Sequence, residues 1–318
     1  MRRFYFFELF TLANLLAIAV IGRNTLHIVG SPLIWIPALT ISLLPYALAG
    51  VGVRALIAWA RRDRTYFAVI RQRAWIVETL RIVFGTGLMI FTYGWIKLIV
   101  PIVHPRLFDQ ELWDLDRLLF FGLSPNVLFL DIFRAPAVLR AIDWSYANVF
   151  YASTLVALAY FFSEPDRRVR VAFANGNAAL WIIGGWLYML VPSLGPAYRF
   201  PDLWFVHEKA LVRTQELQAV LMRNYQNVLR VWAGEKVDHV ILIMFGIGAF
   251  PSLHVAFQTY VFLWMRKSWK SGRVLFAIFV VTMFLGSVVT GWHYLIDSIA
   301  GIALAWGCYR VSRRAMPA

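Results

Sequence analysis

Charged residues are scarce in this chain, because only 15% of its 318 residues are Asp, Glu, Lys or Arg, whereas 60% are hydrophobic. Soluble globular proteins carry about 25% charged residues, so the composition excludes an ordinary water-soluble fold. Cysteine is almost absent, and the single Cys308 excludes an internal disulfide and a cysteine-based metal site. Acidic residues are also few, with 17 against 31 basic residues. The apolar sequence that remains predicts an integral membrane protein.

Apolar runs of about 20 residues, the length that crosses a bilayer as a helix, recur along the whole chain. We predict an all-α fold, a polytopic membrane helix bundle with about eight transmembrane helices. The first run continues past signal-peptide length without a cleavage pattern, so we expect a retained anchor. One membrane domain is expected, with N-terminal helices and an interfacial segment in residues 1–115 and a catalytic core in residues 116–318. The predicted helices are 5–22, 33–60, 78–101, 137–163, 171–191, 243–265, 273–290 and 294–312.

Arginine and lysine gather in alternate connections of this eight-helix arrangement. Loops that stay in the cytoplasm are enriched in arginine and lysine, so both termini are predicted to be cytoplasmic. We expect the protein to lie in the plasma membrane. The net charge of +14 is then mainly a topology signal, with some attraction for anionic lipid. Basic residues do not form a compact patch with interleaved aromatics, so no nucleic-acid partner is expected. The basic segments are Arg2 with Arg3, 61–73, 167–170, 266–273 and 310–314.

The opposite loops, 102–136 and 192–242, are long and hold most of the acids that do not lie at helix ends. In residues 204–232 the apolar positions recur with helical spacing and the charged positions lie between them, so a helix here would have one apolar and one charged face. This pattern is typical of a helix lying in the membrane interface. A structural cap and a lid over a lipid site both fit this helix. The segment 105–126 also resembles an interfacial helix, and within it we favour a structural ion pair or helix cap for Asp116.

Two short segments carry the chemistry, Phe250-Pro251-Ser252-Leu253-His254 and Gly291-Trp292-His293-Tyr294-Leu295-Ile296-Asp297. His293 and Asp297 are four residues apart, a spacing that places both side chains on one face of a helix. An imidazole held by a carboxylate through one ring nitrogen presents the other nitrogen as a nucleophile or base. His254 can then protonate a leaving oxygen, and Ser252 with nearby backbone N–H groups can hold phosphate oxygens. This set suits phosphoryl transfer through a phosphohistidine, without a metal or another cofactor, although histidines satisfied inside a helix bundle are the plainer alternative.

The same segments resemble motifs of the type-2 phosphatidic acid phosphatase superfamily of membrane lipid phosphatases and phosphotransferases. Pro251 to His254 is similar to its Pro-Ser-Gly-His motif, and His293 to Asp297 is similar to the His-x-x-x-Asp end of its last motif. The resemblance covers about residues 116–306. It implies His293 as the nucleophile, Asp297 as its orienting partner and His254 as the general acid.

Two phosphate-binding cations of that superfamily are missing from their usual places. Its Lys-x6-Arg-Pro motif is absent in the usual form, and Ser287 stands where an arginine precedes the nucleophilic histidine. The segments 116–122 and 191–199 are more similar to the inositol phosphorylceramide synthase branch, which implies transfer of a phospho-head-group between lipids. A cation must still offset the phosphate charge, and Arg199 is the first candidate, although snorkelling to the interface would also explain it. Tyr198 is a candidate donor to a phosphate oxygen.

The sequence therefore predicts a membrane lipid phosphotransferase with one active site on the extracytoplasmic face. A lipid or polyprenyl phosphate phosphatase would use the same residues, with water as the acceptor. The expected substrate is a phospholipid, sphingolipid or polyprenyl phosphate. A non-enzymatic lipid transporter is the alternative from another class, and it would be expected to show inverted repeats and interrupted helices.

Overall fold

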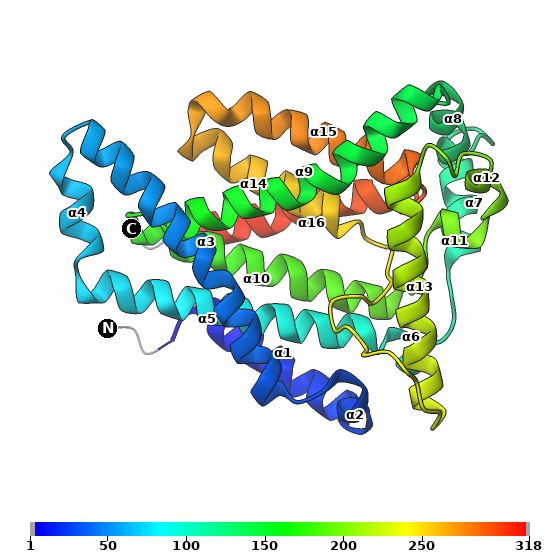
Figure 1. The fold of residues 1–318 in the computed structure, drawn as a ribbon, viewed down its shortest axis with the longest axis horizontal. Coiled ribbons are helices and arrows are strands. Elements are labelled where there is room, and N and C mark those ends of the chain that lie inside the picture. The colour runs from blue at the N-terminus through cyan, green and yellow to red at the C-terminus, as the bar shows by residue number, and fades with distance from the viewer. Residues whose placement is uncertain (1–3, 316–318) are drawn as a thin grey trace.

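The computed structural model describes residues 4–315, with the backbone alone at Lys270; Arg2 and Arg3 lie outside the described residues. The described part is all-helical, without strands, which confirms the predicted fold class. Most of the long helices run roughly along the longest axis, whereas α3 crosses them obliquely and α13 lies across one end (Figure 1). The long helices are α1 (Phe6–Ile21), α3 (Pro32–Ala60), α5 (Arg73–Leu98), α9 (Pro136–Phe162), α10 (Arg167–Leu190), α13 (Val212–Trp232), α14 (Leu253–Ser268), α15 (Arg273–Val289) and α16 (Leu295–Arg314).

Short helices connect the long ones and gather mainly at the ends of the bundle. They are α2 (Leu26–Val29), α4 (Arg64–Ile70), α6 (Val100–Val103), α7 (Asp109–Leu119), α8 (Pro125–Ile132), α11 (Pro196–Arg199), α12 (Asp202–Phe205), and two 3₁₀ turns at Arg23–Thr25 and Lys270–Gly272.

Three of the described helices, α3, α5 and α9, are long and apolar enough to cross a membrane. A fourth span results if α1 and residues 23–29, which meet at a bend of 79°, count as one. Each of the eight predicted ranges overlaps a helix, but the count of eight spans stays a prediction.

The predicted helix at 243–265 is wrong at its start, because α14 begins at Leu253. Pro251 has no N–H to donate, and a proline disfavours helical geometry at the residue before it. Ser252 is the N-cap of α14, with its side-chain oxygen 3.5 Å from the Val255 nitrogen. The 16 residues of α14 extend over about 24 Å, which is less than the ~30 Å of a bilayer core.

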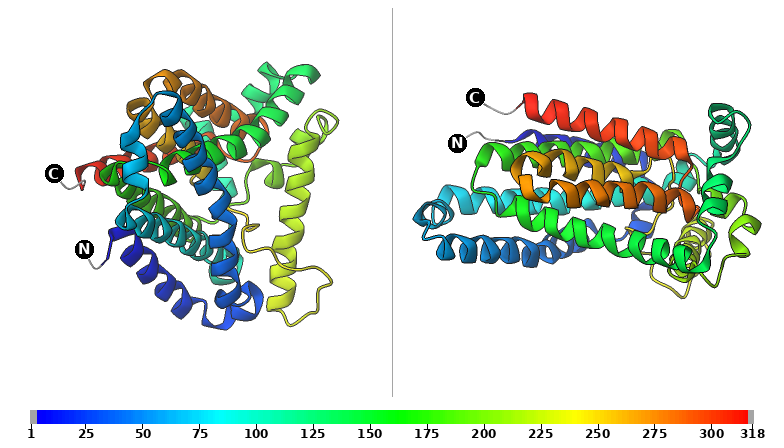
Figure 2. Two further views of the ribbon diagram at one scale, coloured as in Figure 1. Left: turned by 60° about the vertical axis from the view of Figure 1, so that its left-hand side comes forward. Right: turned by 90° about the horizontal axis from the view of Figure 1, so that it is seen from above.

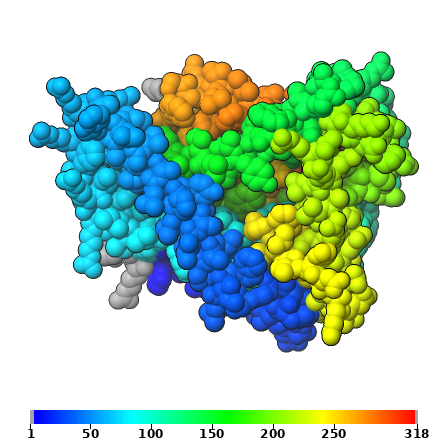
Figure 3. Space-filling view, viewed as in Figure 1, coloured from blue at the N-terminus to red at the C-terminus, as the bar shows by residue number. Residues whose placement is uncertain are grey.

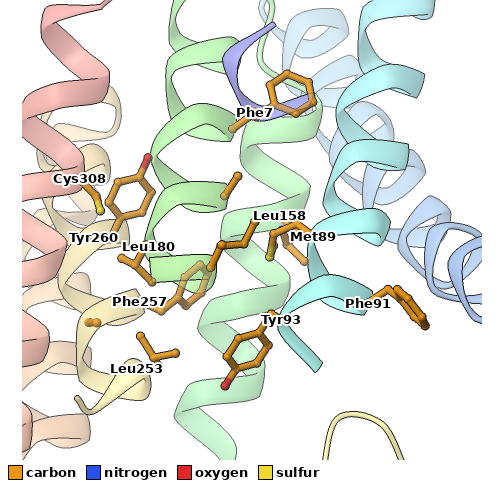
Figure 4. Packing of buried hydrophobic residues seen from close by; sticks show 14 of the residues in the cluster. Phe7, Met89, Phe91, Tyr93, Leu158, Leu180, Leu253, Phe257, Tyr260 and Cys308 are labelled. Atoms are coloured by element: carbon orange, nitrogen blue, oxygen red, sulfur yellow. The ribbon is translucent and has the colours of Figure 1, made fainter. Parts of the chain in front are cut away.

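The main hydrophobic core lies where α5, α10 and α14 meet, and it includes Met89, Leu180 and Phe257 (Figure 4). Small residues allow the closest helix crossings. A Cβ atom on Gly301 of α16 would clash with the Ser252 carbonyl oxygen. The start of α14 is therefore fixed directly against α16.

Buried charge ties the helices together at the end of the bundle where α1 begins. The Glu78 carboxylate accepts hydrogen bonds from Arg167 Nε (2.6 Å), Arg170 Nη2 (2.8 Å) and Tyr5 Oη (2.7 Å). A buried carboxylate needs such partners to offset the loss of water. The three hydrogen bonds therefore join α5 to α10 and to the start of α1. Figure 2 shows that α16 ends at this same end of the bundle.

The two long loops, 102–136 and 192–242, lie at the opposite end, where α7, α8, α11, α12 and α13 cluster (Figures 1 and 2). The amphipathic segment predicted at 204–232 forms a helix only from Val212, and α12 with a turn precedes it. Asn224 of α13 accepts a hydrogen bond from Leu242 N–H (2.9 Å) and donates to the carbonyl oxygens of Leu242 and Phe245. These bonds hold the segment that leads into α14.

Candidate active site

Three segments that are distant in the sequence meet at this end of the bundle. Ala249 N–H donates to the Ser193 carbonyl (3.0 Å), and Ala197 N–H donates to the Gly291 carbonyl (2.9 Å). The segment after α10 is thus bonded both to the approach to α14 and to the turn between α15 and α16. These hydrogen bonds bring the three segments together at one end of the bundle.

His254 and His293 face each other across this junction, with ring centroids 6.0 Å apart at an interplanar angle of 79°. His254 is the second residue of α14, whereas His293 lies in the turn between α15 and α16. Burial lowers the pKa of His293 well below its ordinary value, with the nearby His254 acting in the same direction. This shift favours the neutral imidazole.

The ring of His293 is oriented by a backbone carbonyl. Nδ1 lies 2.8 Å from the Ala249 carbonyl oxygen, and because a carbonyl only accepts, Nδ1 carries the proton. In the neutral ring Nε2 then has a free lone pair. This is the state that a nucleophile or a general base requires.

Asp297 lies close to His293, although not through helical spacing. α16 begins at Leu295, so His293 precedes the helix and the turn brings the two side chains together. Asp297 Oδ2 is 3.6 Å from His293 Nδ1 and accepts a hydrogen bond from Tyr294 N–H at 2.9 Å. The carboxylate is an electrostatic neighbour of the imidazole, while Ala249 makes the direct hydrogen bond.

His254 has a partner that the sequence did not indicate. Tyr146 of α9 is buried, and its hydroxyl lies 2.9 Å from His254 Nδ1. The ring of Phe150, also on α9, packs edge-on against the imidazole with centroids 4.4 Å apart. These contacts engage Nδ1 and leave Nε2 for other partners.

Both histidines line a narrow cavity of about 50 Å³, a space for a few waters or one small group. The only cation on its wall is Lys97 of α5, as far as the described residues extend. The Lys97 ammonium lies 5.4 Å from the ring centroid of Tyr188 and 5.8 Å from that of Tyr93, within the range of cation–π contact. The walls are Tyr93, Lys97, Trp181, Tyr188, Leu194, Leu221, Gly246, Ile247, Gly248, Leu253, His254, Trp292 and His293.

Lys97 is the cavity residue that the sequence interpretation missed, although the sequence holds a signal for it. Lys97 is followed, after six residues, by His104-Pro105. This is the spacing of the Lys-x6-Arg-Pro motif with histidine in place of arginine. His104 Nδ1 lies 2.8 Å from the Met189 carbonyl oxygen, which anchors the end of this motif to α10.

The residues predicted to bind phosphate lie outside the cavity wall. Ser252 is buried, and its N–H donates to the Asp297 carbonyl (2.9 Å). Tyr198 Oη donates to the Gln218 carbonyl of α13 (2.9 Å). Arg199 is exposed, and its Nη2 is 3.4 Å from the side-chain oxygen of Gln110. The first two tie the surrounding elements together, and none of the three side chains reaches the space between the histidines.

Two buried carboxylates of α7 hold the segments around the cavity. Asp109 accepts from Leu194 N–H (3.0 Å), Gly195 N–H (2.8 Å) and Tyr294 Oη (2.9 Å). Burial raises the pKa of Asp109 above its ordinary value, and these hydrogen bonds, which favour the ionised form, act against that shift.

Asp116 accepts from the N–H groups of Leu295 (2.7 Å) and Ile296 (2.9 Å), which are the first two residues of α16. These two N–H groups have no partner within the helix, so Asp116 caps α16 from another element. Burial raises the pKa of Asp116, and the two backbone hydrogen bonds oppose that shift. The helix-cap role favoured for Asp116 is confirmed.

Comparison with known proteins gives one match. A family model described as the PAP2 superfamily matches residues 110–311, which run from the second residue of α7 to near the end of α16. The comparisons with curated proteins and with solved structures found no match. Lys97 and the rest of α5 precede the matched range.

Proposed function

This chain belongs to the PAP2 superfamily, and we propose that it transfers a phospho-head-group between membrane lipids through a phosphohistidine on His293. Membership in the superfamily indicates a phosphatase or phosphotransferase that acts on phosphate esters. The apolar helices make a lipid phosphate the natural substrate, because its head group can reach the cavity while its tails stay among helices. A phospholipid, sphingolipid or polyprenyl phosphate fits this description.

The hydrogen bond from His293 Nδ1 to the Ala249 carbonyl is the observation that carries the proposal. It leaves Nε2 unprotonated, and Nε2 attacks phosphorus while the bond from phosphorus to the leaving oxygen breaks. Asp297, 3.6 Å from Nδ1, stabilises the positive charge that develops on the ring.

His254 supplies the proton that the leaving oxygen needs. For this step His254 carries a proton on both ring nitrogens: Nδ1–H donates to the Tyr146 hydroxyl oxygen, and Nε2 gives its proton to the departing alcohol, which leaves a neutral imidazole. In the second step a new alcohol attacks the phosphohistidine and returns its proton to His254. Water in place of that alcohol would give hydrolysis, so the acceptor alone separates transferase from phosphatase.

Lys97 offsets the negative charge of the phosphoryl group in this proposal. A charged phosphate in a cavity away from bulk water requires a compensating cation, and Lys97 is on the cavity wall. Ser252 contributes by fixing the start of α14 against α16, and Tyr198 by fixing α13. In this proposal Arg199, which is exposed, meets the head group as it arrives from the aqueous side.

The test is transfer of a labelled head group by the purified protein in detergent. Phosphatidylinositol labelled in its head group is incubated with ceramide or diacylglycerol, and the products are identified by mass. We expect His293→Ala to lose at least about 10³-fold in turnover and His254→Ala about 10²- to 10⁴-fold. His239→Ala, which changes an exposed histidine outside the cavity, is the matched control and should keep full turnover.

A phosphorylated protein should be trapped in wild type after rapid acid-free quenching, and it should be missing in His293→Ala. Release of free inositol phosphate and diacylglycerol, with no new lipid that carries the labelled head group, would favour the phosphatase. Full turnover in His293→Ala would contradict the mechanism, and lipid transport that persists in that variant would favour a transporter.

A further inference from the structure

A second cavity lies at the other end of the bundle, where α1 begins and α16 ends. Its volume is about 620 Å³, which is within the range of ligand pockets. The walls come from α3, α4, the last part of α9 and the short turn that follows α14. Figure 3 shows α3 and α4, in blue to cyan, beside the green atoms of α9. None of its lining residues belongs to the catalytic cavity.

We propose that this cavity binds one anionic membrane phospholipid, with its phosphate at Arg61 and one acyl chain between α3 and α9. The bound lipid is not the substrate, since the histidines are at the opposite end of the helices. The proposal does not depend on the phosphotransferase mechanism, because its evidence comes from other residues.

The rim of the cavity carries uncompensated positive charge. The Arg61 side chain lines the cavity, is exposed, and makes no hydrogen bond or ion pair with any part of the chain that the structure describes, whereas its backbone N–H donates to the Ile57 carbonyl (3.0 Å). The acid nearest in sequence, Asp63, is engaged with Thr65, whose N–H donates to it at 2.8 Å. Residues 61–73 hold five arginines against one aspartate, a net charge of +4 that attracts anionic lipid head groups.

Arg54 gives the cavity a fixed polar wall beneath Arg61. Its Nη2 is 2.6 Å from Glu164 Oε2, its Nε donates to Ser163 Oγ (3.0 Å), and its guanidinium lies 4.2 Å from the Tyr160 ring centroid. Because Glu164 already balances Arg54, the charge available to a ligand is that of Arg61. A zwitterionic head group also brings a phosphate, but its own cation offsets that charge, so an anionic head group compensates Arg61 best.

The rest of the cavity suits an acyl chain. Val53 and Ile57 of α3 and Val156 of α9 line it and are exposed, so they offer apolar surface that has no protein partner. α3 and α9 make close contact below, where a Cβ on Gly50 would meet the Ala159 carbonyl oxygen. Aromatic residues with one polar edge favour the level of lipid head groups, and the cavity rim holds Tyr66, Tyr160 and Trp269.

Lipid titration of the full chain in detergent, followed by native mass spectrometry, tests the proposal. The probes are dioleoylphosphatidylglycerol and dioleoylphosphatidylcholine. Wild type should bind the anionic lipid several-fold more tightly than the zwitterionic one. Arg61→Ala should weaken phosphatidylglycerol binding about fivefold and weaken phosphatidylcholine binding less.

Matched variants separate a specific site from general attraction. Arg71→Ala removes an exposed arginine of the same basic segment that does not line the cavity, so it should bind like wild type. Val156→Trp should lower binding of both lipids, because the larger side chain fills the acyl-chain space. Ile57→Trp fills the same space from α3 and replaces the first variant if that one folds poorly. Inorganic phosphate at 100-fold excess over lipid should not displace the lipid.

Equal losses in Arg61→Ala and Arg71→Ala would show attraction by the whole basic segment and overturn the proposed site. Binding that is unchanged in both tryptophan variants would overturn it as well. Displacement of the lipid by inorganic phosphate would show that the cavity binds a free anion and would also overturn the proposal.

Discussion

Lys97 has the least expected position of any residue in the catalytic cavity. A lysine within a helix of membrane-crossing length is costly unless its charge has a use. Its neighbours there are the rings of Tyr93 and Tyr188, which stabilise an ammonium group but do not neutralise it. An arriving phosphate would provide the missing negative charge.

We expect Lys97→Met, which keeps the length and apolar character of the stem, to lower kcat/KM for head-group transfer about 10²- to 10³-fold. The reason is that removing one preorganised charge partner from a developing oxyanion costs this much in other enzymes. Steady-state kinetics on the phosphatidylinositol substrate measure the effect. The comparison is Arg199→Met, for which a smaller loss is expected because Arg199 is exposed and does not line the cavity.

Lys209→Met, at an exposed lysine, controls for a general loss of positive charge on the protein. A larger loss in Arg199→Met than in Lys97→Met would restore Arg199 as the main phosphate-binding cation. The two variants therefore decide between the residue that the sequence favours and the one that the structure favours.

The residue-level prediction from sequence was incomplete for a physical reason. Residue type and motif spacing indicate His254 and His293, because imidazoles at membrane depth need a function. Their hydrogen-bond partners, Tyr146 and the Ala249 carbonyl, come from a distant helix and from a loop backbone. A carbonyl is present in every residue, so no sequence pattern identifies the one that orients a ring.

At the scale of elements, α7 holds the turn after α10 and the start of α16 in fixed positions relative to each other. Its two buried carboxylates, Asp109 and Asp116, bond to backbone N–H groups of both. The turn that holds His293 is directly before α16, so a shift of this helix start would move the imidazole. Asp109 and Asp116 of the 102–136 loop thus contribute to the site by holding the backbone around His293 in place.

We expect Asp116→Ala to lower the free energy of unfolding by about 2 kcal/mol, because two buried N–H groups at the start of α16 lose their acceptor. Thermal unfolding in detergent measures this loss. Asp116→Asn keeps one acceptor oxygen and should recover part of it. Head-group transfer should fall together with stability, since His293 loses its fixed position.

Asp114→Ala is the matched control on the same helix. The Asp114 side chain is exposed and accepts only from Gln110 Nε2 (3.1 Å), so its loss should change stability by less than about 0.5 kcal/mol. An Asp116→Ala protein as stable as wild type would show that water or another group replaces the cap.

Elements were predictable where apolar length decides the structure. The ranges 33–60 and 137–163 agree with α3 and α9 to within one residue, because long apolar runs between arginine-rich or proline-rich ends leave few alternatives. Residues 243–252 are equally apolar, yet they form the loop that supplies the Ala249 carbonyl. Hydropathy does not distinguish an apolar loop buried beside a site from an apolar helix. Pro251 is the sequence feature that indicates a helix start after it.

At the scale of the whole molecule, the arginine-rich segments and the site lie at opposite ends. The arginine-rich segments 61–73 and 167–170 are at the end where α1 begins, and the two histidines are at the other (Figure 1). In a membrane, positive-inside topology would make the first end cytoplasmic and open the site to the outside. Lipids would then exchange head groups in the outer leaflet, while the proposed anionic-lipid cavity would face the inner one.

Cysteine labelling of cells tests this orientation, because Cys308 is the single native cysteine and is buried. In a Cys308→Ala background, Leu123→Cys places a thiol on the exposed loop between α7 and α8, and Arg71→Cys places one between α4 and α5. We expect a membrane-impermeant maleimide to label position 123 in intact cells and position 71 only after permeabilisation. The opposite pattern would place the histidines on the cytoplasmic side, and then the lipids of the inner leaflet would be the substrates of the same chemistry.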